Sequence, residues 1–256
     1  MRIYFMGICG TAMGNAALLM RALGHEVMGS DTGIYPPMSD HLRGAGVDIL
    51  EGWSAERLAQ LKPDLVVVGN VASRGHPEVE WLLETRTQPY VSLPELLRTR
   101  LLNDRRNVVV AGTHGKTTTT SLLVRIFTEA GLDPNFVVGG ELLDEGVGAR
   151  WTGAEWTIVE ADESDGTHLE LPLSATILTN IDSDHLDHYG DLQGITNSFQ
   201  KYVLGIDGPV VMCVDDPTIA GLVKPQQCVT YGFSGDAQFR CHSVESNNGL
   251  TSFAIS

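Results

Sequence analysis

Short apolar runs alternate with stretches of mixed apolar and polar residues over the first hundred positions of the chain. The apolar runs predict strands at residues 2–8, 25–30, 65–69 and 89–92. The mixed stretches predict helices at residues 15–23, 77–84 and 94–102. A glycine-rich turn at residues 10–14 is expected to separate the first strand from the first helix. Such alternation is typical of an α/β domain built on a parallel sheet.

The same alternation begins again after the polar run that ends at residue 107. A strand is predicted at residues 107–111 and a helix at residues 117–130. Further strands are predicted at residues 156–160, 175–179 and 209–214. These runs are β-branched without polar alternation, as expected for parallel strands buried on both faces. Residues 239–256 instead predict antiparallel strands that are joined by a turn at residues 247–249. The sequence thus predicts two α/β domains, residues 1–106 and residues 107–256.

The amino-acid composition excludes some classes of binding partner. Hydrophobic residues make up 43% of the chain, and 32 acidic residues against 17 basic ones give a net charge of −15. This charge disfavours binding to nucleic acid or to an anionic membrane through a general field. No apolar run approaches the roughly 18 residues of a membrane span, and no signal peptide is recognisable. Four scattered cysteines form neither a zinc motif nor a disulfide framework. We expect a cytoplasmic monomer or weak dimer without nucleic-acid or membrane partners.

A glycine-rich loop follows the predicted strand at residues 107–111 and carries Lys116 and Thr117 into a helix. In such a loop backbone N–H groups point at phosphate oxygens, the lysine reaches the β/γ-phosphates and the hydroxyl binds Mg²⁺. The general motif has a further glycine where this chain has Val110, so the loop is a short form. The alternative is a glycine-containing turn with a solvated lysine. The residues assigned to a nucleoside triphosphate are Gly112, Thr113, His114, Gly115, Lys116, Thr117 and Thr118.

Acidic residues cluster after two of the predicted strands. The strand at residues 156–160 ends in Glu160, which opens an acidic run, and the strand at residues 175–179 is followed by acidic residues around His185. Ligands of open parallel sheets bind beyond the carboxyl ends of the strands, and Mg²⁺ prefers oxygen ligands. The two clusters therefore indicate a metal site beside the loop, with solvated acidic loops as the alternative. His168 and His188 are weaker candidates, interpreted as surface or supporting residues.

A second glycine-rich turn joins the first strand to the first helix and contains Gly7, Gly10 and Gly14. Asp31 follows Gly7 by 24 positions, at the end of the next strand. Such a turn can hold a diphosphate while the acidic residue reaches a ribose hydroxyl, so a nicotinamide or flavin enzyme is a rival hypothesis. The dinucleotide glycine register fails, however, because its second and third glycines are Cys9 and Ala12 here. Two alternatives remain: the turn binds a diphosphate of another kind, or it binds no ligand.

These motifs, in this order and spacing, resemble those of the Mur ligases, the ATP-dependent amide-forming enzymes of peptidoglycan assembly. The resemblance spans essentially the whole chain. It implies a Rossmann-like parallel-sheet domain that binds UDP-N-acetylmuramate, followed by a P-loop-type α/β domain that binds ATP and Mg²⁺. The central half is similar to family members that add L-alanine, and the N-terminal half to recycling members that attach murein tripeptide. The acceptor is therefore an amino acid or a peptide.

The resemblance also implies roles for single residues. ATP would phosphorylate the lactyl carboxylate of UDP-N-acetylmuramate, and an amine would attack the acyl phosphate. Lys116 would stabilise the transferring phosphoryl group, Thr117 and Glu160 would hold the Mg²⁺ bound to ATP, and His185 a second Mg²⁺. Asn180 would join the ATP site. The UDP-sugar site would comprise Gly7, Cys9, Gly10, Thr11, Met13 and Asp31.

One departure from the family is large. Mur ligases have a third domain that carries acceptor-binding residues, and an Asn-rich segment that contacts adenine, whereas this chain ends at Ser256 before both. We expect a shortened version of a ligase, a natural fragment or an inactive homologue, which binds UDP-N-acetylmuramate without completing ligation. A sugar-nucleotide-binding module that never turns over is the alternative from another class.

Overall fold

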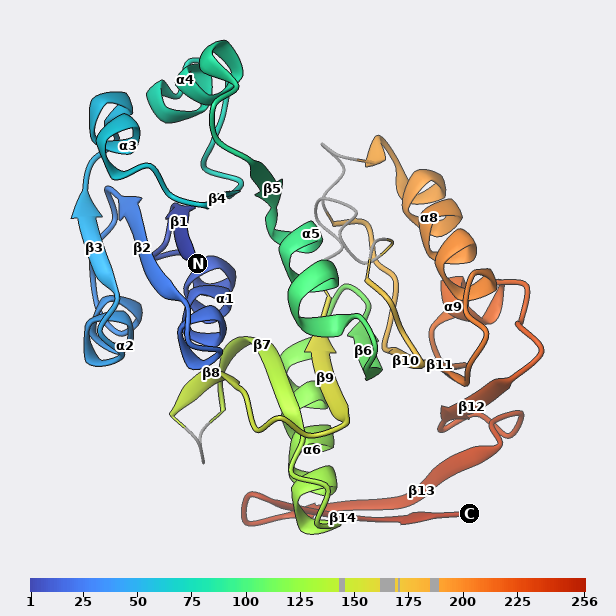
Figure 1. Ribbon diagram of the computed structural model, residues 1–256. Coiled ribbons are helices and arrows are strands. Elements are labelled where there is room, and N and C mark those ends of the chain that lie inside the picture. The colour runs from blue at the N-terminus through green and yellow to red at the C-terminus, as the bar shows by residue number, and fades with distance from the viewer. Residues whose placement is uncertain (143–145, 162–168, 170, 185–188) are drawn as a thin grey trace. The chain divides into compact units, whose positions relative to one another are not determined.

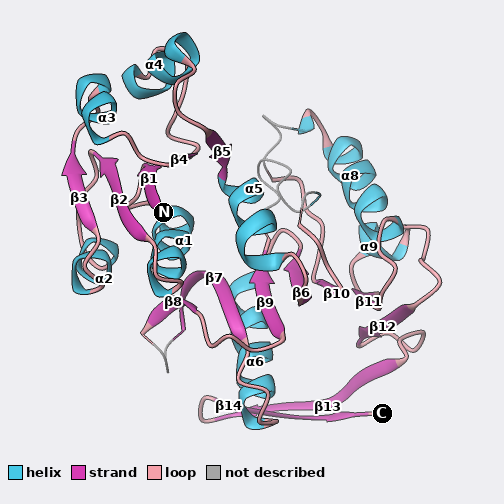
Figure 2. Ribbon diagram, viewed as in Figure 1, coloured by secondary structure: helices cyan, strands magenta, loops and turns pink. Residues whose placement is uncertain are grey.

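A computed structural model shows a mixed α/β protein (Figure 1, Figure 2). The structure describes residues 1–142, 146–161, 169, 171–184 and 189–256. The described chain divides into two compact units. Unit 1 comprises Met1–Arg105 and Ile126–Thr157, and unit 2 comprises Arg106–Arg125 and Ile158–Ser256. The domain boundary between residues 106 and 107 stays a prediction.

Unit 1 contains a parallel sheet with the strand order β3-β2-β1-β4-β5. Its strands are β1 (Arg2–Met6), β2 (Glu26–Asp31), β3 (Asp48–Glu51), β4 (Leu65–Val68) and β5 (Tyr90–Ser92). Its helices are α1 (Thr11–Ala22), α2 (Met38–Gly44), α3 (Ala55–Leu61), α4 (Pro77–Thr85) and α5 (Leu93–Leu97), which continues as the π-helical turn η1 (Arg98–Leu102). The predicted parallel α/β arrangement is confirmed, whereas β3, α2 and α3 had no prediction.

The glycine segment at residues 10–14 is mostly helix, because α1 begins at Thr11. The prediction of a turn there was wrong. A Cβ atom on Gly14 would lie 2.3 Å from the Met38 sulfur, so this glycine lets α1 and α2 approach closely. A glycine in a helix costs about 1 kcal/mol in propensity, which close packing between helices can offset.

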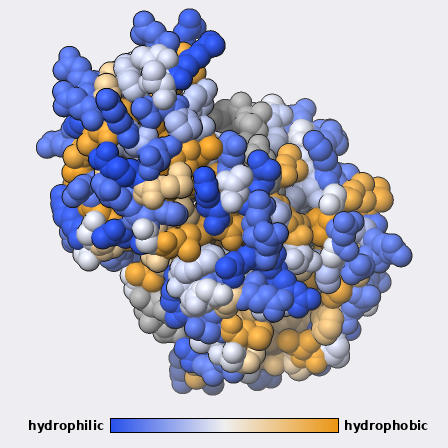
Figure 3. Space-filling view, in the orientation of Figure 1, coloured by the Kyte–Doolittle hydropathy of each residue, from blue (hydrophilic) through white to orange (hydrophobic). Residues whose placement is uncertain are grey.

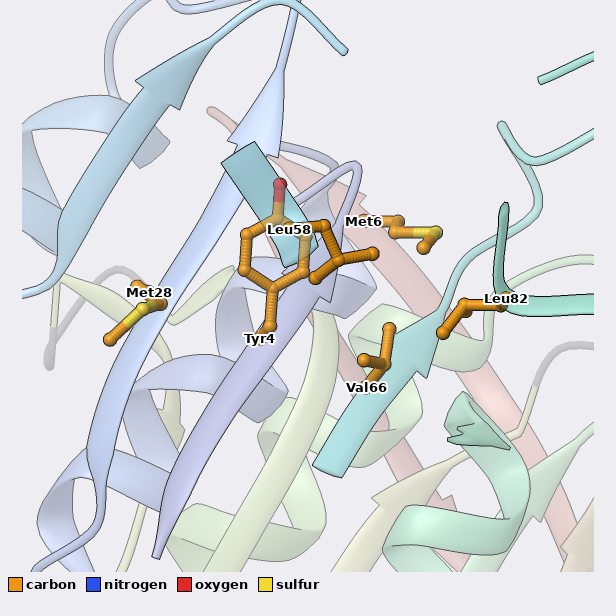
Figure 4. Packing of buried hydrophobic residues seen from close by; sticks show 6 residues of the cluster. All are labelled: Tyr4, Met6, Met28, Leu58, Val66 and Leu82. Carbon is orange, nitrogen blue, oxygen red and sulfur yellow. The ribbon is translucent and has the colours of Figure 1, made fainter. Parts of the chain in front are cut away.

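An apolar core lies between the sheet of unit 1 and the helices α3 and α4 (Figure 4). Its fully or almost fully buried members are Tyr4, Met6, Met28, Leu58, Val66 and Leu82. Burial of each such side chain contributes about 1.5–3 kcal/mol. The core fixes the strands of the sheet, and with them the turn that follows β1.

Unit 1 also contains the antiparallel pair β7 (Asn135–Leu142) and β8 (Val147–Arg150), which had no prediction. This pair packs against α1, where the buried Asn15 amide donates to the Val138 carbonyl oxygen at 2.9 Å. Helix α1, which follows the first glycine turn, is thus supported by the pair as well as by the parallel sheet.

The second sheet has the strand order β14-β13-β12-β11-β10-β6-β9-β7-β8. Its remaining strands are β6 (Arg106–Ala111), β9 (Trp156–Glu160), β10 (Ala175–Leu178), β11 (Val210–Cys213), β12 (Cys228–Gly232), β13 (Phe239–Asn247) and β14 (Leu250–Ile255). The pairs β6–β10, β10–β11 and β11–β12 are parallel, and β13–β14 is antiparallel. The predicted antiparallel strands over residues 239–256 are confirmed. Strand β12 had no prediction.

The other helices are α6 (Lys116–Glu129), α8 (Leu192–Leu204) and α9 (Pro217–Ala220). The prediction placed α6 correctly and missed the other two. An aspartate caps each of these two: Asp191 accepts from Gly194 N at 2.8 Å, and Asp216 accepts from Ile219 N at 2.8 Å. Such caps satisfy otherwise unpaired N–H groups at a helix start and contribute about 1 kcal/mol.

The molecular face in Figure 3 carries many hydrophilic residues with smaller hydrophobic areas between them. None of the helices that the structure describes combines the length and the apolar character needed to cross a bilayer.

Candidate phosphate-binding site

The loop between β6 and α6 surrounds an open cavity of about 360 Å³ in unit 2. Strand β6 ends at Ala111 and α6 begins at Lys116, so the loop joins the carboxyl end of a buried strand to the N-terminus of a helix. Such a position suits an anion, because backbone N–H groups and the helix dipole both favour negative charge there. The residues that line the cavity are Thr113, His114, Gly115, Lys116, Thr117, Thr118 and Glu160.

Gly112 turns the chain out of β6 with a φ of +127°. A Cβ atom at this position would lie 2.2 Å from Thr179 Oγ1 and 2.8 Å from the Asn180 carbonyl oxygen. Both the backbone conformation and the space therefore require glycine. The short loop is thus pressed against the segment that follows β10, rather than standing free.

The Lys116 ammonium group lies over its own loop. Its Nζ donates to the carbonyl oxygens of Gly112 at 2.7 Å and of Thr113 at 3.1 Å. These contacts hold the charge beside the cavity, where a phosphate oxygen would be a stronger acceptor than a neutral carbonyl.

Thr117 and Glu160 meet at the cavity from α6 and the end of β9. Thr117 Oγ1 donates to Glu160 Oε1 at 3.0 Å, and both residues are partly buried. A hydroxyl and a carboxylate form an all-oxygen donor set, which fits Mg²⁺. Among the residues that the structure describes, no three His, Cys, Asp or Glu side chains gather to hold a metal.

The His114 imidazole lies close to two carboxylates of the segment that follows β10. His114 Nε2 is 3.5 Å from Asp182 Oδ2 and 3.8 Å from Asp184 Oδ2, and all three residues are exposed. The Ser183 backbone N–H, and then His114, lower the pKa of Asp182 below its ordinary value. Asp182 is therefore ionised at neutral pH and places negative charge beside the His114 ring.

Asn180 binds the backbone of the loop in this structure. Its Oδ1 accepts from His114 N at 2.8 Å, and its Nδ2 donates to the His114 carbonyl oxygen at 2.9 Å. Thr179 Oγ1 donates to the same carbonyl oxygen at 2.8 Å, and Asp182 N donates to Thr113 Oγ1 at 2.9 Å. Thr179 was not a sequence candidate. The available signal was its place at the end of β10, next to β6 in the sheet.

The second predicted metal ligand, His185, lies outside the described residues, as do His168 and His188. The same holds for the acidic run that follows Ala161. The role of His185 therefore stays a prediction.

The N-terminal glycine turn of unit 1 is organised by Asp31. Its two carboxylate oxygens accept from Cys9 N and Gly33 N, each at 2.8 Å, and only 8% of the residue is exposed. Gly7 N donates to the Ser30 carbonyl oxygen at 2.8 Å. Burial, and then the charge of Asp31, raise the pKa of the Cys9 thiol to about 11.

The remaining predicted UDP-sugar residues lie at the end of this turn and in the first turn of α1. Gly10 is the N-cap of α1, Thr11 is its first residue, and Met13 is 7% exposed. A Cβ atom on Gly69 would lie 3.1 Å from the Met13 terminal methyl, so Met13 packs within unit 1. The turn itself is formed by Gly7 to Gly10, before α1 begins, and its ligand stays a prediction.

Comparison with known proteins identifies the family. The model of the Mur ligase middle domain matches residues 110–256, and the model described as Mur ligase family, catalytic domain, matches residues 2–104. The chain belongs to the Mur ligase family. The resemblance drawn from the three sequence motifs is thereby confirmed.

Several relatives of known name are similar over the whole chain. UDP-N-acetylmuramate–L-alanine ligase of Stenotrophomonas maltophilia (strain K279a) is 40% identical over 99% of this chain and 53% of its own length. A solved UDP-N-acetylmuramate:L-alanyl-γ-D-glutamyl-meso-diaminopimelate ligase from Neisseria meningitides is 32% identical, with a TM-score of 0.89, over 100% of this chain and 83% of that one. UDP-N-acetylmuramate–alanine ligase MurC from Thermotoga maritima is 26% identical, with a TM-score of 0.87, over 100% of this chain and 57% of that one. The chain thus spans about half the length of the curated relatives that it matches.

Proposed function

We propose that this chain carries the nucleotide- and UDP-sugar-binding parts of an ATP-dependent ligase. The ligase joins L-alanine to the lactyl carboxylate of UDP-N-acetylmuramate through an acyl phosphate. The observation that carries the proposal is the Thr117–Glu160 pair, 3.0 Å apart, in the same cavity as Lys116. The L-alanine acceptor is supported by the relative from Stenotrophomonas, which is 40% identical over almost the whole chain.

Phosphoryl transfer chiefly needs positioning and neutralisation of charge. Bound triphosphate replaces the carbonyl oxygens as the partner of Lys116, whose ammonium group then stabilises the transferred phosphoryl oxygens. Thr117 and Glu160 would hold Mg²⁺, which would supply positive charge to the triphosphate. The chain carries a net charge of −15, so these local groups, rather than a general field, attract the nucleotide.

In unit 1, the glycine turn and the start of α1 take the diphosphate of UDP-N-acetylmuramate. Gly10 lies at the N-cap without a side-chain cap, so the first N–H groups of α1 suit an anionic ligand. Asp31 keeps the turn in place through the N–H groups of Cys9 and Gly33. The four free cysteines support a reducing, cytoplasmic location.

A second candidate acceptor is the murein tripeptide. It is supported by the Neisseria structure, whose name includes this peptide and whose TM-score with this chain is 0.89. Phosphate release by a full-length relative, measured with L-alanine and with tripeptide as alternative acceptors, separates the two candidates.

Titration calorimetry of this chain with MgATP and with UDP-N-acetylmuramate tests the proposal. Lys116→Ala should weaken MgATP binding at least tenfold, since a charge-assisted bond to phosphate is lost, and should leave UDP-N-acetylmuramate binding nearly intact. Lys201→Ala, which removes an exposed lysine of α8, is the control and should change neither affinity. Equal loss of affinity for both ligands in Lys116→Ala would contradict separate sites for ATP and for UDP-N-acetylmuramate. Tight binding of NAD, without binding of UDP-N-acetylmuramate, would contradict the proposal that the N-terminal glycine turn binds a UDP-sugar.

A further inference from the structure

We infer that Thr179 and Asn180 are positioning residues for the phosphate loop: they orient the peptide between His114 and Gly115 so that its N–H faces the bound phosphates. The inference rests on the proposed ATP site and assigns Asn180 a role other than contact with the nucleotide.

The carbonyl oxygen of His114 has two donors. Thr179 Oγ1 lies 2.8 Å from it and Asn180 Nδ2 lies 2.9 Å from it. A carbonyl oxygen has two lone pairs, so these donors use its full ordinary capacity. Thr179 is 8% exposed, which limits the water available to replace its hydroxyl. The direction of this carbonyl is therefore fixed by the segment after β10.

The direction of a carbonyl determines that of the adjoining N–H. A peptide unit is planar and trans, so its N–H points away from its C=O. The His114 carbonyl points at Thr179 and Asn180, and the Gly115 N–H of the same unit therefore points to the opposite side. Gly115, Lys116 and Thr117 line the cavity, so that side is where phosphate oxygens bind.

The preceding peptide is fixed in the same way. Asn180 Oδ1 accepts from His114 N at 2.8 Å, and the Asn180 carbonyl oxygen accepts from Thr113 N at 2.9 Å. One side-chain amide thus binds both the N–H and the C=O of His114. These contacts hold a loop that is shorter than the general phosphate loop and has Val110 in place of its first glycine.

Without these contacts the His114–Gly115 peptide can rotate and present its carbonyl oxygen to the phosphates. A carbonyl dipole aimed at an anion is repulsive, whereas an N–H donor is attractive. Loss of the Thr179 and Asn180 contacts should therefore lower the affinity for phosphate. The affinity should fall by the same factor for every ligand that places a phosphate in the loop.

An equal fold-loss in affinity for all phosphate ligands distinguishes a positioning role from direct contact with the nucleoside. The affinities of MgATP, MgADP and magnesium tripolyphosphate are measured by calorimetry for wild type, Asn180→Ala and Asn180→Asp. Asn180→Asp keeps an acceptor for His114 N and places an oxygen against the His114 carbonyl. We expect both variants to lose about tenfold or more in affinity for all three probes, by similar factors.

Thr179 supplies a second pair of variants of nearly equal size. Thr179→Val removes the hydroxyl and should weaken the three probes several-fold, whereas Thr179→Ser retains the hydroxyl and should restore affinity. Asn197→Ala, at an exposed site in α8, is the matched control. Two measurements show that each variant is folded. The midpoint of thermal unfolding should stay close to that of wild type, and the affinity for UDP-N-acetylmuramate should stay within twofold of wild type.

Three results would overturn the inference. Loss of MgATP and MgADP binding with unchanged tripolyphosphate binding would make Asn180 a nucleoside contact. Unchanged affinity for all probes would remove any role in the loop. Parallel loss of UDP-N-acetylmuramate binding would indicate a general structural role. A wild-type chain that binds none of the three phosphate probes would instead overturn the proposed ATP site, and the inference with it.

Discussion

Thr117 Oγ1 donates a hydrogen bond to Glu160 Oε1 across 3.0 Å and joins the first turn of α6 to the end of β9. A hydroxyl has one proton and two lone pairs. Because the Thr117 hydroxyl donates its proton in the hydrogen bond to the carboxylate, its lone pairs are left free to bind a cation. In the proposed Mg²⁺ site, Glu160 would therefore orient the Thr117 hydroxyl as well as supply its own negative charge.

Glu160→Gln should make ATP binding less sensitive to Mg²⁺. The amide keeps the size of the side chain but removes the charge, and its NH₂ group can turn a donor toward Thr117. We expect the gain in ATP affinity on adding Mg²⁺ to fall by about tenfold, which corresponds to about 1.4 kcal/mol. Calorimetric titration with ATP in Mg²⁺ and in EDTA measures this gain. Glu129→Gln, at the exposed far end of α6, is the control, and an undiminished Mg²⁺ effect in Glu160→Gln would contradict the assignment.

Cys9 should react slowly with iodoacetamide in the folded chain. Its pKa is raised to about 11, first by burial and then by Asp31, so about a thousandth of the thiol is ionised at pH 8. An ordinary thiol with a pKa near 8.5 is about one quarter ionised at that pH. Mass spectrometry of the Cys9 peptide, with the same chain in urea as the control, should show labelling at least a hundredfold slower when folded. Equal rates in the two states would contradict the raised pKa.

The sign of the pH effect on stability follows from the same pKa. The folded thiol has a higher pKa than the unfolded one, so the folded state favours the protonated form. Its contribution to stability is present below about pH 8.5 and is lost as the pH rises toward 11.

The buried strands were predictable because their β-branched runs leave little choice of structure. β6 and β9 each follow from an apolar run that ends in a chemically distinct loop. Helix α8 was missed although its signals are present: Asp191 caps it, and Ile195, Phe199 and Tyr202 follow at helical spacing. The helix follows directly after the acidic segment around His185, whose charged residues dominate the local pattern.

Long-range contacts between side chain and backbone were not predictable. The Asn180 amide and His114 are 66 positions apart, and no local pattern says that a polar residue after one strand will bind the loop after another. The residue types indicated that Asn180 lies at the sheet edge formed by the carboxyl ends of the strands. Its proposed role, however, follows only from its two distances to the His114 backbone. For the same reason, the hydrogen bonds from Cys9 N and Gly33 N to Asp31 had no prediction, and the place of Asp31 in the UDP-sugar site stays a prediction.

Glu78→Ala should destabilise unit 1 strongly. Glu78 is 0% exposed and accepts from the Tyr4 hydroxyl at 2.7 Å and from Ser30 Oγ at 2.8 Å, with the Arg57 guanidinium 3.7 Å away. Its removal leaves these donors and a charge without their partner, which costs about 3–5 kcal/mol. Urea denaturation measures the free energy of unfolding. Glu84→Ala, at an exposed site of α4, should change it by less than about 0.5 kcal/mol, and a similarly small change in Glu78→Ala would contradict the network.

Asn135→Ala should also destabilise the chain, because this buried side chain binds four backbone groups between Thr152 and Trp156. Asn135 is 1% exposed. Its Nδ2 donates to the carbonyl oxygens of Ala154 at 2.8 Å and Trp156 at 3.0 Å, and its Oδ1 accepts from Thr152 N and Gly153 N, each at 2.9 Å. Alanine leaves the N–H groups of Thr152 and Gly153 without their Asn135 acceptor and removes one donor from each of the carbonyl oxygens of Ala154 and Trp156. Arg105 still donates to the Ala154 carbonyl oxygen at 2.6 Å.

We expect Asn135→Ala to lower the free energy of unfolding by about 2–4 kcal/mol, since each unsatisfied buried group costs about 1–3 kcal/mol and some regain water. Asn135→Asp tests the direction of the bonds: it keeps the acceptor for Thr152 and Gly153, loses the donor and adds a charge beside two carbonyl oxygens. It should therefore be no more stable than alanine. Asn103→Ala, at an exposed position, should change the unfolding free energy in urea by less than about 0.5 kcal/mol. If Asn135→Asp were as stable as wild type, the donated bonds to the carbonyl oxygens would contribute nothing, and the loop would have to be held by other contacts.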